Sequence, residues 1–175
     1  MWTISILLVL ISVTNCCSYT GNGPPPDKLS LISDVRKKVA LKVRKERNLC
    51  AIGTGAQAMD QIKMLGLSFN YNEELTIDEG RELLVYVVDE FVRSVNEEPK
   101  IQPFLANVPF EAKNIEIRIF LQKPDGHEFE DGKLSVIRCL NGRLEFAVND
   151  SQSDLLVKTA YTESFAQALE KTNNR

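Results

Sequence analysis

Residues 76–98 carry the strongest secondary-structure signal in the sequence. Thr76 is followed three residues later by Glu79, the spacing of a capping box, in which two side chains satisfy free amide groups of the first helical turn. Apolar residues then recur every three or four positions, which requires one face of a helix to be buried. Pro99 ends the pattern, because the residue before a proline avoids the helical conformation. The sequence therefore predicts a long central helix with this buried face: Ile77, Leu84, Val87, Val88, Phe91, Val92 and Val95.

Alternating residues beyond this helix predict an antiparallel sheet. Residues 114–122 alternate apolar and polar side chains, and Asn141-Gly142 is typical of a tight hairpin between residues 134–140 and 143–148. A fourth strand is predicted at residues 155–161, and a strand at the edge of the sheet is predicted at residues 67–71. Thr162 is the predicted cap of a short final helix. The proline-rich residues 99–110 are expected to strap one end of the core. We expect an α+β fold, a meander of three to four antiparallel strands covered by helices on one face.

Residues 28–49 predict a basic helix before the central one. Its expected apolar face holds Leu29, Ile32, Val35, Val39 and Val43. Eight basic residues against two acidic ones lie between positions 28 and 48, although the whole chain has 21 basic and 24 acidic residues. Such a helix binds an anionic membrane surface or nucleic acid, docks against an acidic part of its own fold, or faces solvent. The net charge of −3 excludes little. We do not expect nucleic acid as the partner, and the candidate residues for an anionic surface are Lys37, Lys38, Lys42, Arg44 and Lys45.

The N-terminal residues predict export. Residues 4–13 form an apolar run too short to span a bilayer but long enough for the core of a signal peptide. The export signal can be processed in two ways. One is cleavage after Ser18, which gives a signal peptide of residues 1–18. The other is lipidation of Cys16, because residues 13–16 resemble a bacterial lipobox, although Asn15 departs from that pattern. Residues 19–27, rich in Gly and Pro, predict a flexible tether to a single domain of residues 28–172.

Residues 50–65 contain two glycines near their start, and the residues after them are expected to form a helix. Gly53, Gly55 and Ala58 formally match a dinucleotide-binding pattern, but a helix rather than a strand is expected to precede them, so we predict no nucleotide site. His127 is the only histidine, and the acidic residues around it lack the spacing of a calcium loop. We therefore predict no catalytic residue, metal or cofactor.

Cys50 and Cys139 remain in the expected domain. In an oxidising compartment they could form a disulfide, for which chain entropy estimates a stabilisation of about 4 kcal/mol. The alternative is two separate thiols, and the sequence leaves both open.

Four motifs resemble a family of small, exported, uncharacterised proteins of intracellular bacteria. They are residues 64–69 (MLGLSF), 80–84 (GRELL), 109–110 (PF) and 114–117 (NIEI), and the resemblance covers about residues 49–169. It implies a secreted or envelope location, and it implies no activity and no site residue.

The sequence thus predicts an exported, non-enzymatic interaction protein located in the periplasm, on the outer envelope as a lipoprotein, or outside the cell. Its expected partner is a protein or an anionic membrane surface. The alternative is a secreted hydrolase or carbohydrate-acting enzyme that uses carboxylates which the sequence does not locate.

Overall fold

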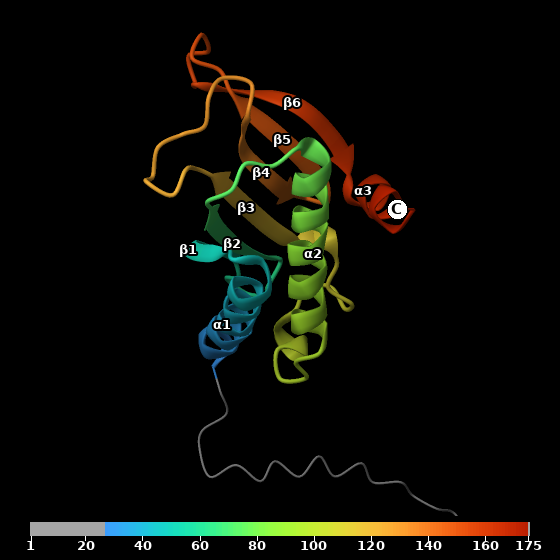
Figure 1. Ribbon diagram of the computed structural model, residues 1–175. Helices are drawn as coiled ribbons and strands as arrows, with labels where there is room; N and C mark the ends of the chain where they lie inside the picture. The colour runs from blue at the N-terminus through green and yellow to red at the C-terminus, as the bar shows by residue number, and fades with distance from the viewer. Residues whose placement is uncertain (1–26, 175) are drawn as a thin grey trace, which may run out of the picture.

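A six-stranded mixed sheet and three helices make up the computed structural model, which describes residues 27–174 (Figure 1). The α+β class is confirmed. The elements are α1 (Lys28–Arg47), β1 (Cys50–Gln57), β2 (Met64–Tyr71), α2 (Ile77–Asn96), the short 3₁₀ turns η1 (Gln102–Phe104) and η2 (Ala112–Asn114), β3 (Ile115–Leu121), β4 (Leu134–Leu140), β5 (Arg143–Asn149), β6 (Val157–Ser164) and α3 (Phe165–Asn173).

The strands lie side by side in chain order, from β1 to β6. All neighbours are antiparallel except β2 and β3, which run parallel because α2 connects them across the face of the sheet. The prediction of a purely antiparallel meander of three to four strands is therefore wrong in number and direction. The strand predicted at an edge from residues 67–71 is β2, an inner strand between β1 and β3.

The helix predicted over residues 76–98 is present as α2, although α1, of the same length, packs beside it. The Thr76 side chain accepts from the Glu79 amide, and the Glu79 side chain accepts from the Thr76 amide, so both halves of the capping box are present. Leu84, Val88 and Phe91 are fully buried against the sheet. Burial of side chains of this size stabilises by about 1.5–3 kcal/mol each, which makes this face the centre of the core.

Residues 50–57 form β1 and not the start of a helix. Cys50 pairs with Asn70, and from Gly53 to Gln57 each residue pairs with one of β2, after a bulge between Ala51 and Gly53. Seven of the eight residues are exposed. A strand so little buried shows no alternation of apolar and polar side chains, so its sequence gave no signal of a strand.

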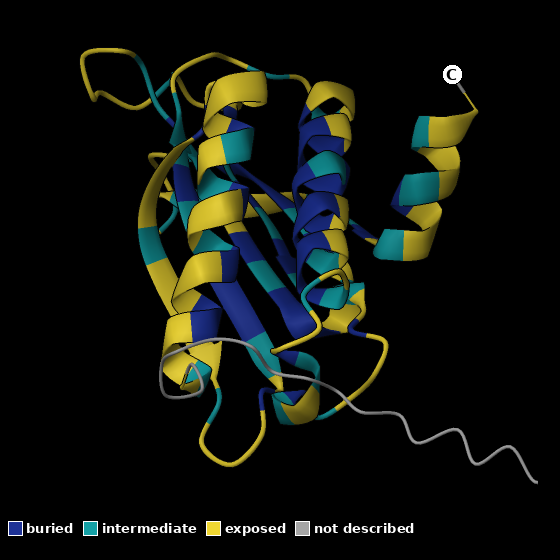
Figure 2. Cartoon of the chain, turned by 90° about the horizontal axis from the view of Figure 1, so that it is seen from below, coloured by how far each residue is buried: buried dark blue, intermediate teal, exposed yellow. Residues whose placement is uncertain are grey.

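The helices α1 and α2 lie side by side across one face of the sheet (Figure 2). Ile32, Val35, Val39 and Val43 of α1 are buried as predicted. Leu29, predicted on the same face, is 69% exposed, and Leu31 is buried instead. Leu31 lies four residues before Val35, so it continues the same buried face of α1, and only Leu29 lies outside that face.

The hairpin β4–β5 and the strap are also confirmed. Asn141 and Gly142 have φ values of 52° and 72°, as the tight turn of such a hairpin requires. Ile101, Leu105 and Phe110 of residues 99–110 are buried in the core. The final helix is capped by Ser164 and not by Thr162, because β6 extends to Ser164.

A buried ion pair connects α2 to β6. Arg81 Nε lies 2.5 Å from Glu163 Oε1, and both side chains are almost fully buried. Lys171 of α3 also binds Glu163, at 2.7 Å, and Asp78 binds Arg81. One carboxylate thus holds together three elements at the β6 end of the sheet.

Candidate interaction surface

Two of the predicted binding residues lie next to carboxylates of the same chain. Lys42 Nζ lies 2.7 Å from Glu90 Oε2, a carboxylate that is 5% exposed, and Lys38 Nζ lies 3.9 Å from Glu97 Oε2. Glu90 belongs to α2 and Glu97 is the residue that caps its C-terminal end, and the guanidinium of Arg47 also lies 4.6 Å from the centre of the Tyr86 ring on that helix. This side of α1 docks on an acidic helix, which was one of the alternatives for the basic segment.

The other three predicted residues point elsewhere. Lys37, Arg44 and Lys45 are exposed, and within the part of the chain that the structure describes their side chains have no hydrogen-bond or ion-pair partner. Arg44 lies four residues after Ala40, so it continues the row of α1 that faces β1. Positive charge on α1 is therefore available on its outer surface and on the side of β1.

Arg36 contributes to the same side of α1 and was not among the predicted residues. Its guanidinium donates to the carbonyl oxygen of Gly55 in β1. Its Nε is buried and has no hydrogen-bond partner among residues 27–174. Partial burial lowers the pKa of Arg36, because desolvation opposes the charged form. Arg36 therefore adds a cation beside Lys37 on this side of α1.

A groove of about 320 Å³ runs between α1 and β1. On the helix side it is lined by Leu29, Ser33, Arg36, Lys37 and Ala40, and on the strand side by Ala51, Thr54 and Ala56. The exposed Leu29 thus lies in this groove and not in the core. The strand residues in its wall have small side chains, and Arg36 of α1 reaches the carbonyl oxygen of Gly55 on the strand. The result is an apolar groove with basic side chains in its wall.

The strand β1 is a free edge of the sheet. Only β2 pairs with it among residues 27–174, so every second residue of β1 offers its N–H and C=O groups outward. Its sequence, CAIGTGAQ, has no charged residue and no proline. The other edge strand, β6, carries Lys158 and Glu163 and leads directly into α3. Charged side chains discourage the pairing of an edge with another chain, and β1 lacks them.

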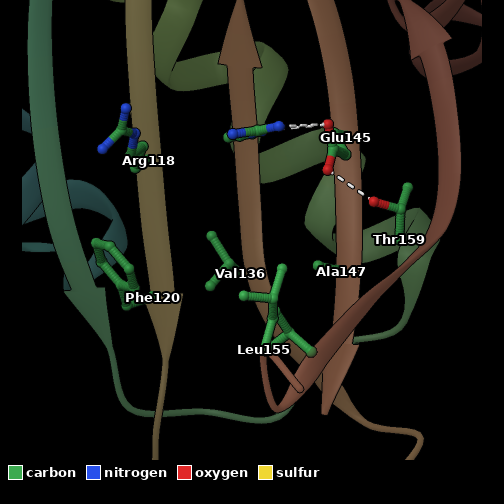
Figure 3. A pocket seen from close by; sticks show the side chains of 9 residues that line it. Arg118, Phe120, Val136, Glu145, Ala147, Leu155 and Thr159 are labelled. Atoms are coloured by element: carbon green, nitrogen blue, oxygen red, sulfur yellow. Dashed lines mark hydrogen bonds and ion pairs between the residues drawn. The ribbon is translucent and has the colours of Figure 1, made fainter. Parts of the chain in front are cut away.

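The sheet face opposite the helices has a second hollow, of about 410 Å³ (Figure 3). Phe120, Val136, Ala147 and Leu155 form its apolar part, and Arg138, Glu145 and Thr159 lie together at one side. Hydrogen bonds from Arg138 hold the pKa of Glu145 below its ordinary value, burial opposes this, and Thr159 adds to it. Glu145 is the only carboxylate that lines this hollow within the described residues. This hollow therefore does not supply the pair of carboxylates that the alternative hydrolase would use.

The two cysteines of the domain do not meet. Cys50 is exposed on β1 and Cys139 is buried on β4, with β2 and β3 between them, and both thiols are free. Three strand spacings separate these strands by about 14 Å, well beyond the span of a disulfide. Burial raises the pKa of Cys139 to about 12, so this thiol is unreactive in the folded protein. Cys16 lies outside the described residues.

The remaining sequence motifs form no site in the structure. Gly53 and Gly55 lie within β1, so they are not in the strand-to-helix turn that holds a dinucleotide. In residues 27–174 no group of three or more His, Cys, Asp or Glu side chains could hold a metal ion. The same residues contain no helix long and apolar enough to cross a membrane.

Comparisons with protein families, with curated proteins and with solved structures found no match to this chain. The resemblance to exported proteins of intracellular bacteria stays a prediction. The function is therefore argued from the α1–β1 face, which consists of the groove, the edge strand β1 and the basic residues Arg36, Lys37 and Arg44.

Proposed function

We propose that this protein is an exported, non-enzymatic binding protein whose α1–β1 face binds an acidic partner protein. The observation that carries the proposal is the groove between α1 and β1, which combines an apolar lining with Arg36 and Lys37 in its wall. Acidic side chains of a partner complement these cations, and apolar side chains fill the remaining space.

A protein fits this face better than an anionic membrane. A membrane surface attracts a helix through a continuous row of basic residues, at about 1 kcal/mol for each. Lys42 is paired with the buried carboxylate of Glu90, and the exposed Lys38 lies 3.9 Å from Glu97, so α1 has fewer free cations than its sequence indicates. The remaining basic residues flank a concave groove beside a strand edge, and a flat lipid surface does not fill a groove.

Export is part of the proposal and rests on the sequence of residues 1–18, which lie outside the described part of the chain. We place the protein in the periplasm, on the outer envelope through Cys16, or outside the cell. A binding role agrees with this placement, because residues 19–27 are suited to hold a domain at a distance from its anchor.

The test measures binding of a defined peptide by calorimetry. The probe is a blocked peptide of about ten residues in which Val and Glu alternate, and its comparison is the same peptide with Lys in place of Glu. We expect saturable binding of the acidic peptide only. The Lys37→Glu/Arg44→Glu variant should weaken it by at least about tenfold, because it replaces two attractions by two repulsions.

The matched control is Lys100→Glu/Lys158→Glu, which changes the net charge equally at exposed positions away from the groove. It should alter the affinity by less than about twofold. Equal weakening by both variants, or no binding of the acidic peptide, would contradict the proposal. Binding to vesicles of phosphatidylserine and phosphatidylcholine, lost in Lys37→Glu/Arg44→Glu while the peptide does not bind, would assign the face to a membrane instead.

A further inference from the structure

We propose that the acidic partner binds as an added β-strand, in which an extended segment pairs with the free edge of β1 and extends the sheet. This inference rests on the proposed function and specifies how the partner is held. Strand addition supplies affinity through main-chain hydrogen bonds and specificity through pockets for alternate side chains. The α1–β1 face offers both.

The hydrogen bonds come from the regular part of β1. Residues 53–57 pair in unbroken register with β2, so their outward N–H and C=O groups are spaced as a further strand requires. Gly53, Gly55 and Ala56 have small or no side chains, which allows another backbone to come close. The edge has neither the charge nor the proline that would prevent pairing.

The pockets for side chains come from α1. Leu29, Ser33 and Lys37 follow one another at intervals of four residues along the groove, a rise of about 6 Å for each step. Side chains on one face of a strand repeat at about 6.6–6.8 Å. Successive side chains on one face of an added strand therefore meet successive positions of α1, and in an alternating Val–Glu strand the Glu side chains on that face reach Arg36 and Lys37.

The charge of the face selects a different protein over a second copy of this chain. Two copies that pair antiparallel through β1 are related by a two-fold axis perpendicular to the sheet. Such an axis places both α1 helices on the same face, next to each other, with Lys37 and Arg44 of each copy turned toward the other. Like charges at this distance disfavour the dimer, whereas an acidic segment is attracted to the same residues.

The test measures amide hydrogen exchange of residues 50–57 in the full-length chain, with and without the alternating Val–Glu peptide at saturation. In the free protein, the amides that point outward should exchange fast because only water binds them. With the peptide bound they should exchange at least about tenfold more slowly, as amides within a sheet do. Residues 157–164 of β6, the opposite edge, serve as the internal control and should not change.

A second measurement uses the same peptide N-methylated at every second residue, in each of the two registers. An added strand donates its hydrogen bonds from one edge only, so at least one methylated peptide should bind at least about tenfold more weakly than the parent. If both bind like the parent, and exchange in β1 does not change, strand addition is wrong while the binding face of the proposed function stands. Absence of any peptide binding overturns both. Slow exchange in β1 that appears with rising protein concentration alone assigns the edge to a second copy.

Discussion

At the scale of single residues, the buried pair of Arg81 and Glu163 is the contact on which the β6 end of the fold depends most. Removal of one partner of a buried ion pair destabilises a protein by about 3–5 kcal/mol when the other charge is left unpaired. Lys171 still binds Glu163 after the loss of Arg81, so we expect Arg81→Ala to lower the free energy of unfolding by about 3 kcal/mol, the lower end of this range. Arg44→Ala, at an exposed helical arginine without a partner, should change it by less than about 1 kcal/mol. Urea denaturation of both variants checks this, and equal effects would contradict the assigned role.

Glu90 makes the stability of the α1–α2 contact dependent on pH. Burial alone would raise the pKa of Glu90, but the hydrogen bonds from Arg93 and Lys42 outweigh it and hold the pKa below its ordinary value. A carboxyl whose pKa is lowered in the folded state stabilises the fold above its unfolded pKa of about 4.3, and this contribution is lost as the pH falls through the folded value.

We therefore expect the difference in unfolding free energy between the natural chain and Glu90→Gln to be constant from pH 7 to about 5 and to shrink toward about pH 3. Urea denaturation across this range measures the difference. The other carboxyls with lowered pKa values, such as Glu79 and Glu145, are present in both chains, so their contributions to the difference in unfolding free energy cancel. A difference that does not depend on pH would show that Glu90 acts through packing alone.

At the scale of elements, the turn between β4 and β5 depends on the conformation of Gly142. Its φ of 72° lies in the left-handed region, which an L side chain adopts at a cost of about 1–2 kcal/mol. Gly142→Ala should therefore destabilise the protein by about that amount. Gly53→Ala is the matched control, because its added methyl would make only an ordinary contact, 3.6 Å from Ser68 Cβ. Thermal unfolding of both should separate them, and equal shifts would contradict the account of the turn.

The elements that sequence predicted well are those that bury one face completely. The helix α2, the strand β3 and the β4–β5 hairpin each combine a clear period with a local signal such as the Thr76 cap or the Asn141-Gly142 turn. β1 lacked a period because nearly all of it is exposed. The parallel pairing of β2 and β3 also has a signal in the sequence, because a long helix between two strands is the usual connection of a parallel pair.

The binding surface could be predicted only in part, because charge on a helix does not show which charges are free. Lys42 is paired with Glu90 of α2 and Lys38 lies near Glu97 at the end of that helix, and both contacts depend on how the two helices pack. Arg36 was missed because its role depends on its position over β1, a strand that the sequence did not reveal. Leu29 is exposed, although the helical pattern places it on the buried face, because it lines the same groove.

At the scale of the whole molecule, the fold offers two surfaces of opposite character. All three helices pack on one face of the sheet or at its β6 end, so the other face keeps an apolar hollow in which the charges are already paired (Figure 1, Figure 3). The α1–β1 face has unpaired cations and a free edge. Unpaired charge beside unpaired backbone is the better basis for recognition of a partner, which is why the proposed function is placed there.

The measurement that tests this account most directly is a titration of the ¹⁵N-labelled protein with the alternating Val–Glu peptide, followed through its amide chemical shifts. We expect the shifts to concentrate in residues 29–44 of α1 and in residues 50–57 of β1. Phe120, Val136 and Ala147, which line the hollow on the opposite face, should not change. Shifts concentrated at these three residues, or no shifts at saturating peptide, would contradict the assignment of the α1–β1 face.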